Sequence, residues 1–91
     1  MVQNYSLILE EKLNEFLGQN VTIIQDGFIQ SCVMINNLKF IIEYEILNIF
    51  DESSNFYLKI NMNQVYKIDF DEKNIKLFLD YDTTIALSLK R

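Results

Sequence analysis

Acidic side chains gather at two predicted turns, and their carboxylates are the groups in this sequence best suited to metal chemistry. They are Asp69, Asp71, Glu72, Asp80 and Asp82. If both turns met at one end of a sheet, these oxygens would suit Ca²⁺ or Mg²⁺. The run DFDEKN, however, lacks the glycine and the distant glutamate of an EF-hand loop. Acidic residues at hairpin tips are usually solvated turn formers, so we predict no metal and no cofactor.

The composition removes the side chains on which most active sites depend. The sequence contains no histidine, the usual general base at neutral pH, and Cys32 is its single cysteine. Serine-type and cysteine-type triads therefore lose their imidazole, and one chain can form neither a disulfide nor a thiolate metal cluster. Carboxylate pairs need a cleft that so short a chain rarely builds. We predict a protein that is not an enzyme, with Cys32 as a buried thiol in an apolar run.

Length and charge limit the class of partner. The 91 residues form one domain, 1–91, and a hydrophobic fraction of 49% favours an exposed apolar surface or a homo-oligomer. The net charge of −5 disfavours nucleic acid as a partner.

The N-terminal sequence indicates the location of the protein. Glu10 and Glu11 stand where a signal peptide would be apolar, and no stretch is long enough to span a membrane, so we expect a cytoplasmic protein. Richness in Ile, Asn and Lys indicates an AT-rich bacterial or mobile-element gene.

Hydrophobic periodicity predicts one helix at the start of the chain. Apolar residues recur at helical spacing within residues 6–17, and these residues are Leu9, Leu13, Phe16 and Leu17. Ser6 is the predicted N-cap, and Gly18 is the predicted C-terminal stop. We expect this helix to pack over a sheet.

From about residue 20 to 90 the period changes to two, which predicts six or seven antiparallel strands. Asp26-Gly27 suits a type I′ turn that pairs residues 22–25 with 28–31. Asn36-Asn37 suits a second tight hairpin, between residues 33–35 and 38–40. Later turns are predicted in the runs DESSN and DEKN and at residues 81–83.

Residues 38–50 are the ambiguous stretch. Alternation gives way to an almost continuous apolar run, which predicts one long strand with a bulge near Ile46-Leu47. A helix is the alternative, but the β-branched and aromatic content favours a strand. The expected fold is therefore mostly β (α+β), an N-terminal helix followed by an antiparallel meander that forms a small barrel or rolled sheet of the SH3/Sm-like type.

Short motifs resemble the Sm-like family, especially its bacterial Hfq branch. They are Leu13-Asn14, Val21-Thr22-Ile23, Gly27-Phe28, Phe50-Asp51 and Val65-Tyr66-Lys67-Ile68. In that branch, a helix with Leu-Asn leads into a Val-Thr/Ser-Ile strand and an Asn-Gly turn, and Phe-Asp and Tyr-Lys-His pieces follow. The resemblance implies a bent five-stranded barrel, a ring oligomer and single-stranded RNA bound through Tyr66 and Lys67. Ile68 replaces the family histidine, and the chain between Gly27 and Phe50 is longer than in that branch.

Aromatic residues at outward positions indicate the class of function. Tyr5, Tyr57 and Tyr81 fall at a helix start, an outward strand position and a turn, and Phe28 lies beside its turn. Because no basic residue interleaves them, we expect a non-enzymatic protein–protein interaction module that self-associates or docks a protein through this patch or an edge strand. The alternatives are an Sm-like RNA-binding protein and a small acidic inhibitor of phage or mobile-element type, whose five acidic side chains would mimic a row of phosphates.

Overall fold

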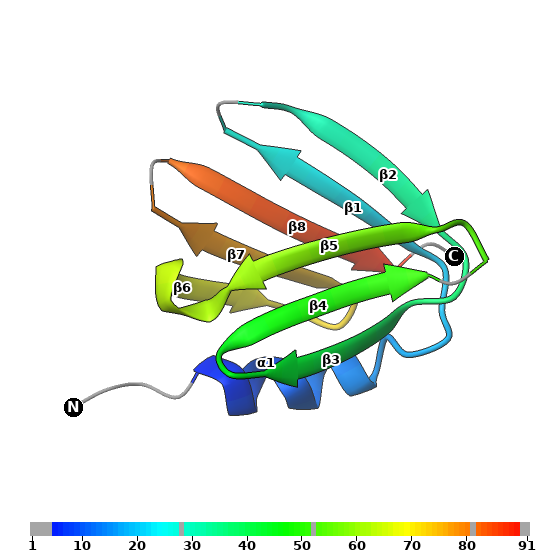
Figure 1. Ribbon diagram of the computed structural model, residues 1–91, viewed down its shortest axis with the longest axis horizontal. Helices are drawn as coiled ribbons and strands as arrows, with labels where there is room; N and C mark the ends of the chain where they lie inside the picture. The colour runs from blue at the N-terminus through cyan, green and yellow to red at the C-terminus, as the bar shows by residue number, and fades with distance from the viewer. Residues whose placement is uncertain (1–4, 28, 52, 81, 90–91) are drawn as a thin grey trace.

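The computed structural model describes residues 5–27, 29–51, 53–80 and 82–89, in which one helix precedes eight strands (Figure 1). The elements are α1 (Tyr5–Asn14), β1 (Val21–Asp26), β2 (Ser31–Ile35), β3 (Lys39–Glu43), β4 (Ile46–Asp51), β5 (Phe56–Asn61), the 3₁₀ helix η1 (Met62–Gln64), β6 (Val65–Phe70), β7 (Asn74–Leu79) and β8 (Thr83–Leu89). The fold is mostly β, as the change of period predicts. No helix in the described part of the chain is long and apolar enough to cross a membrane.

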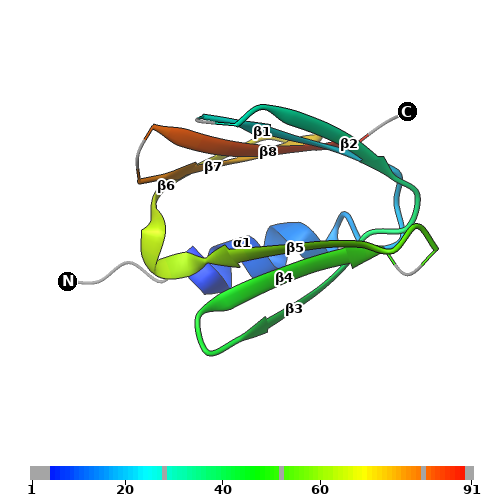
Figure 2. The same cartoon turned by 45° about the horizontal axis from the view of Figure 1, so that its top comes forward.

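The strands form two facing sheets (Figure 2). The large sheet has the order β2-β1-β8-β7-β6, and the small sheet has the order β3-β4-β5. The helix α1 contacts β3 and lies beside the small sheet, so the two together cover one face of the large sheet. Because strand pairing does not join the two sheets within the described residues, the chain forms a two-layer sandwich of eight strands there. The predicted six- or seven-stranded small barrel or rolled sheet is therefore wrong in its number of strands and in its closed form.

The large sheet combines a local meander with a long-range pairing. Strands β6, β7 and β8 follow one another both in sequence and in space, as predicted. The centre of the sheet is different, because β1 pairs with β8 from Val21↔Leu89 to Asp26↔Thr84. Two segments far apart in the sequence are therefore neighbours in the middle of this sheet.

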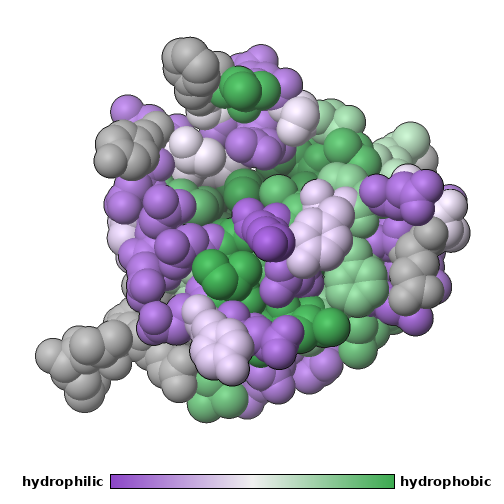
Figure 3. Space-filling model, viewed as in Figure 1, coloured by the Kyte–Doolittle hydropathy of each residue, from purple (hydrophilic) through white to green (hydrophobic). Residues whose placement is uncertain are grey.

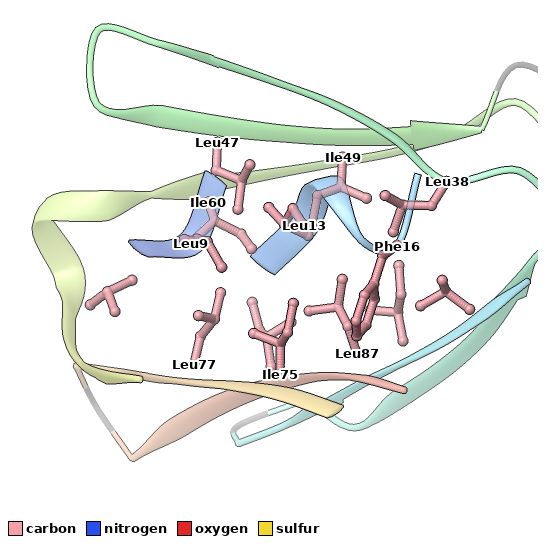
Figure 4. Close-up of a cluster of buried hydrophobic side chains, with 14 of the residues drawn as sticks. Leu9, Leu13, Phe16, Leu38, Leu47, Ile49, Ile60, Ile75, Leu77 and Leu87 are labelled. Atoms are coloured by element: carbon pink, nitrogen blue, oxygen red, sulfur yellow. The ribbon is translucent and has the colours of Figure 1, made fainter. Parts of the chain in front are cut away.

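The hydrophobic core fills the space between the layers (Figure 4). From α1 and the turn that follows it, Leu9, Leu13 and Phe16 point into this core, and each is at most 1% exposed. The strands and the segments that connect them add Val21, Ile23, Ile35, Leu38, Leu47, Ile49, Ile60, Met62, Val65, Ile75, Leu77, Leu79, Ile85 and Leu87. Leu17 is 44% exposed, so its predicted place in the apolar stripe is wrong. The helix ends at Asn14, after which helical spacing no longer decides which residues are buried.

The end of the helical segment partly follows the sequence prediction. Gly18 has a φ of 73°, the left-handed conformation that suits a glycine stop. The α-helix itself ends earlier than predicted, at Asn14. Helix α1 already includes Tyr5 and Ser6, so the prediction that Ser6 is its N-cap is wrong.

The β1–β2 hairpin is longer and more open than the sequence predicts. The β1–β2 pairing ends at Gln25↔Ser31, so the two strands are not joined by a two-residue turn at Asp26-Gly27, and Asp26 pairs instead with Thr84 of β8. Gly27 lacks the positive φ that a type I′ turn requires. A Cβ added to Gly27 would lie 2.8 Å from Oγ1 of Thr83 and 3.2 Å from its Cα. Glycine is therefore needed at this position for the close approach to the start of β8.

Asn36-Asn37 carries the chain from the large sheet to the small sheet, so the second predicted hairpin is wrong. The backbone N–H of Gly18 donates to the carbonyl of Leu38 at 2.9 Å, and the N–H of Leu38 donates to the carbonyl of Gln19 at 3.2 Å. Leu38 is completely buried in the core. The chain crosses to the small sheet here because Leu38 is buried and its backbone is bonded to the segment after α1. A local turn pattern such as Asn-Asn does not reveal these long-range contacts.

The tight turn lies at Tyr44-Glu45, inside the stretch predicted as one long bulged strand. These two residues have φ of 51° and 64°, the positive values that the central residues of a type I′ turn adopt. Glu43 pairs with Ile46 across the turn, so the stretch folds back as the β3–β4 hairpin. The strand prediction for this stretch is confirmed, while the bulge near Ile46-Leu47 and the alternative helix are wrong.

The 3₁₀ helix η1 returns the chain from the small sheet to the large one, where the sequence predicts an uninterrupted meander. The backbone N–H of Met62 donates to the carbonyl of Glu45 at 2.8 Å, which ties η1 to the β3–β4 turn. The N–H of Asp80 donates to the carbonyl of Gln64 at 3.2 Å, which ties η1 to the β7–β8 turn. The predicted turns after β4, β6 and β7 are confirmed.

Cys32 is exposed, so its predicted burial is wrong. It lies on β2, the outermost strand of the large sheet, and pairs with Ile24 of β1. The side chains of both residues are exposed on the face of the sheet that points away from the core. An apolar run in a sequence does not distinguish an edge strand from a central one, and this difference decides the exposure of Cys32.

Candidate functional site

The five acidic side chains do not gather at one site. Those at the β6–β7 turn are Asp69, Asp71 and Glu72, and those at the β7–β8 turn are Asp80 and Asp82. Consecutive turns of an antiparallel meander lie at opposite ends of the sheet, and the six residues of β7 span about 20 Å between them. No group of three or more His, Cys, Asp or Glu residues within the described ranges could hold a metal ion. A row of phosphate-like charges would therefore have to extend along all of β7.

Asp71 uses its carboxylate to form the β6–β7 turn. Its Oδ1 accepts hydrogen bonds from the backbone N–H groups of Lys73 at 2.9 Å and Asn74 at 3.0 Å, and Asn74 Nδ2 also donates to it at 3.0 Å. The hydrogen bond from the backbone N–H of Lys73 contributes most to lowering the pKa of Asp71, and the bonds from Asn74 add to it. Hydrogen bonds donated to a carboxylate lower its pKa because they stabilise the charged form. Asp71 is thus a turn former, as acidic residues at hairpin tips usually are.

Tyr66 and Lys67 lie beside two residues that the sequence did not single out. The rings of Tyr66 and Phe78 have centroids 6.3 Å apart and are tilted by 55°. Lys67 Nζ lies 5.0 Å and Lys76 Nζ 5.2 Å from the centroid of Phe78. Lys67 Nζ also lies 3.8 Å from Asp69 Oδ2. Tyr66, Lys67, Lys76 and Phe78 are here called the β6–β7 cluster.

Tyr57 lies on the outer face of the small sheet, as its outward position in the alternation predicts. Strand register places it opposite Phe50, and places Asn48 between Ile41 and Lys59 in the next row. Ile41, Asn48, Phe50, Tyr57 and Lys59 form what is here called the aromatic face. Figure 3 views this side of the molecule and shows hydrophobic side chains gathered between hydrophilic ones. A shallow hollow of about 270 Å³ opens here.

The side chains of the aromatic face hold one another in place. The Tyr57 hydroxyl donates to Asn48 Oδ1 at 2.7 Å, and Asn48 Nδ2 donates to the carbonyl of Ile41 at 3.3 Å. The rings of Phe50 and Tyr57 are stacked, with centroids 6.4 Å apart and an angle of 21° between their planes. Tyr57 remains 58% exposed. The hydroxyl, the ring and the supporting amide are therefore positioned before any ligand arrives.

Basic side chains accompany these aromatic rings, which corrects an expectation from the sequence. Lys59 Nζ lies 5.8 Å from the centroid of Tyr57. Lys39 pairs with Phe50 and so stands in the same row as the two rings. Lys59 follows Tyr57 by two residues on the same face of β5, a spacing that the sequence shows, whereas only the register of the sheet brings Lys39 of β3 beside Phe50 of β4.

Asp51 anchors the end of β4 next to Phe50, and sequence reasoning missed this role. Its side chain is buried, and it accepts hydrogen bonds from the Ser53 hydroxyl at 2.6 Å, the Ser53 N–H at 2.9 Å and the Asn36 N–H at 3.0 Å. These donors, led by the Ser53 hydroxyl, lower the pKa of Asp51 from 3.8 to about 2. The Asp-x-Ser pattern is a local signal for such a turn, but the bond from Asn36 has none.

Two predicted site residues, Phe28 and Tyr81, lie outside the described residues, as does the side chain of Tyr5. A comparison of the chain with models of protein families, with curated proteins and with solved structures finds no match. The candidate site therefore stands on the geometry of the aromatic face and of the β6–β7 cluster.

Proposed function

We propose that this chain is a non-enzymatic protein-interaction module that docks a protein partner on the aromatic face. The observation that carries this proposal is the stacked Phe50–Tyr57 pair at one end of an exposed sheet face, where Asn48 holds the Tyr57 hydroxyl. Tyrosine is enriched at interface hot spots because its ring buries a large area while losing little conformational entropy. The bond to Asn48 reduces that entropy loss further, since the Tyr57 side chain is already oriented.

The charges around the aromatic face favour a partner that carries an acidic side chain. Lys39 and Lys59 flank the rings, and Glu43 lies at the far end of β3, so this face is locally basic in a chain whose net charge is −5. Such a contrast steers and orients an oppositely charged group more than it adds affinity. An extended segment with an apolar side chain over Ile41 and Phe50 and a carboxylate near Lys59 fits the surface.

Site-specific photo-crosslinking in the organism that encodes the chain tests this proposal. A photoreactive amino acid would replace Ile41 on the aromatic face or, as the matched control, Thr84 on the opposite outer face of the molecule. We expect a discrete, nuclease-resistant protein adduct from position 41 and none from position 84. The proposal fails if position 41 gives no adduct, or if the adducts from the two positions are the same.

Truncation of the two rings gives the quantitative arm of the test. Tyr57→Ala and Phe50→Ala should each weaken binding of the captured partner by about 2 kcal/mol or more, as truncation of a hot-spot aromatic does. Tyr44→Ala is the matched control, because Tyr44 is 94% exposed at the β3–β4 turn and lies outside the aromatic face. Equal losses for Tyr57→Ala and Tyr44→Ala would contradict a site centred on the ring pair.

The β6–β7 cluster supports a second candidate, single-stranded nucleic-acid binding. It combines two aromatic rings, on which bases could stack, with two lysines that could contact phosphates. Tyr66 and Lys67 are also the residues for which the Sm-like resemblance implies RNA contact. Fluorescence anisotropy with labelled single-stranded RNA at low salt tests this candidate. If the β6–β7 cluster binds nucleic acid, the affinity for RNA should fall as the salt concentration rises, and Lys67→Ala should weaken it. Absence of RNA binding at low salt excludes this function.

A further inference from the structure

The described residues form four sheet edges, and β2 is the one with the fewest features that block pairing. Strand β6 carries Lys67 and Asp69 and an irregular register after Val65. Strand β3 contains charged residues and has α1 beside it, and β5 contains Lys59. Strand β2, with the sequence SCVMI, has no charge and no proline. Natural proteins protect edges with charges, bulges, proline or a covering element, and an edge without them pairs with another strand.

The surface beside this edge is apolar as well. Ile24 of β1 is 44% exposed and lies opposite the exposed Cys32. Met34 is 62% exposed and pairs with Thr22, and Ile29 in the loop is 64% exposed. We call β2 together with Ile24 the β2 edge. It joins unprotected backbone to a strip of exposed side chains.

Charge identifies which occupant can reach the β2 edge. Within residues 21–35, Asp26 is the only charged residue, whereas the whole chain carries a net charge of −5. Two copies of so acidic a chain repel each other over most of their surface. At the β2 edge two copies can approach without opposing like charges on the strand itself, and an antiparallel strand pair has the two-fold symmetry of the commonest homodimers.

We propose that β2 pairs antiparallel with β2 of a second copy, so that two five-stranded sheets become one ten-stranded sheet. This inference goes beyond the docking proposal, because it uses a surface at the edge of the other sheet. A two-fold axis at Val33 pairs all five residues of each strand, with Val33 opposite its own copy and Cys32 opposite Met34 of the second copy. The half-buried Val33 would then be covered by its symmetry mate.

Charge reversal across this pairing provides the test. Cys32→Lys/Met34→Lys places lysine opposite lysine twice in the homodimer, and Cys32→Glu/Met34→Glu does the same with glutamate. Sedimentation velocity over a concentration series should show wild-type dimers of twice the 10.8 kDa chain mass, and each variant alone should dissociate at least about tenfold more readily. A mixture of the two variants should dimerise again, because every opposed pair then has opposite charges.

Rescue in the mixture separates a lost interface from a lost fold, and circular dichroism confirms that each variant alone retains its strands. Ile41→Lys/Tyr57→Lys, on the aromatic face, is the matched control and should keep the wild-type dissociation constant. This control also separates the dimer from the docking site, because dimers that persist in it are independent of the partner surface. A monomeric wild-type chain at millimolar concentration overturns the proposal, as do variants that retain the dimer or a mixture that stays monomeric.

Cysteine crosslinking tests the register. In a Cys32→Ser background, Val33→Cys places two thiols directly opposite each other, within the range of Cα separations that a disulfide spans. Wild-type Cys32 and its symmetry mate lie diagonally, about 7–8 Å apart at Cα, where a disulfide fits poorly. We expect rapid oxidation to a covalent dimer for Val33→Cys and slow oxidation for the wild type. Faster crosslinking of the wild type would exclude an axis at Val33.

Discussion

Replacing Tyr44-Glu45 by Asn-Gly should stabilise the protein, because the β3–β4 turn holds two ordinary residues in the left-handed conformation. Tyr44 has a φ of 51° and Glu45 a φ of 64°. This conformation destabilises most L-residues because their Cβ comes too close to the following carbonyl oxygen. Glycine has no Cβ and so avoids this contact, and for asparagine the cost is smaller. Asn-Gly is also the dipeptide that type I′ turns prefer.

The size of the gain follows from the backbone angles and the contacts that are lost. Relief at both positions is worth about 2 kcal/mol, at about 1 kcal/mol for each residue. Against this stand the extra flexibility of glycine in the unfolded chain, about 0.5 kcal/mol, and the exposed hydrogen bond from Asn63 Nδ2 to Glu45 Oε2, about 0.5 kcal/mol. The net expectation is about 1 kcal/mol, or a rise in Tm of about 4–8 °C for a domain of this size.

Thermal and urea unfolding followed by circular dichroism measure this gain. The matched control is Asp26→Asn, which creates Asn-Gly at the turn favoured by the sequence, where Gly27 lacks a positive φ. We expect this control to change the free energy of unfolding by no more than about 0.5 kcal/mol, since a surface substitution away from special features has little effect. The reasoning is refuted if the Asp26→Asn variant gains stability while the Asn-Gly replacement at Tyr44-Glu45 does not.

Three further predictions concern the core and the connections. Gly27→Ala should destabilise the protein by about 1–3 kcal/mol in urea unfolding, because the added Cβ would lie 2.8 Å from Thr83 Oγ1. Adding Thr83→Ala should restore part of that loss. A Gly27→Ala variant as stable as the wild type would contradict the close approach. Asp51 has a folded pKa of about 2, below its ordinary 3.8, so the stability it contributes is present above pH 3.8 and is lost as pH falls towards 2. Urea midpoints measured across this pH window should therefore fall more steeply in the wild type than in Asp51→Asn. Parallel curves for the two proteins would count against a stabilising role of the Asp51 carboxylate. Leu13→Ala should cost about 2–5 kcal/mol and Leu17→Ala less than about 1 kcal/mol in thermal unfolding, because Leu13 is buried and Leu17 lies beyond the end of α1; similar costs would restore the longer predicted helix.

Alternation of period two located β7 and β8 of the large sheet well, because one face of each of these strands is buried. Ile75 and Leu77 of β7 and Ile85 and Leu87 of β8 are all in the core, as the pattern requires. The helical stripe likewise identified Leu9, Leu13 and Phe16. In each case the signal is local, since burial of one face sets the spacing of apolar residues along a single element.

The assignment of strands to sheets was not predictable from such local signals. Asn36-Asn37 is a good turn sequence, yet the chain crosses there because Leu38 is buried and bonded to the segment after α1. Tyr44-Glu45 is a poor turn sequence, yet it turns tightly because the pairing of β3 with β4 demands it. Tertiary packing overrides local propensity at both places.

The candidate site was predictable only one residue at a time. The alternation around Tyr57 places its side chain outward, as the structure confirms. Its partners Phe50 and Asn48 become neighbours through the register of β4 and β5, which no spacing in the sequence specifies, whereas Lys59 follows Tyr57 on the same face of β5. The same holds for Phe78, which reaches Tyr66 only because β6 and β7 pair with an irregular register.

The pairing of β1 with β8 affects how the chain is made. During synthesis the β1–β2 hairpin leaves the ribosome early, and the β6–β7 hairpin leaves much later. Neither can join the other until β8 (Thr83–Leu89) emerges and inserts between them. Until then both hairpins present unpaired strands, and contacts between such distant segments form slowly, typically in milliseconds to seconds. The nascent chain is therefore most prone to aggregate just before β8 is released, which gives a chaperone its clearest period of action.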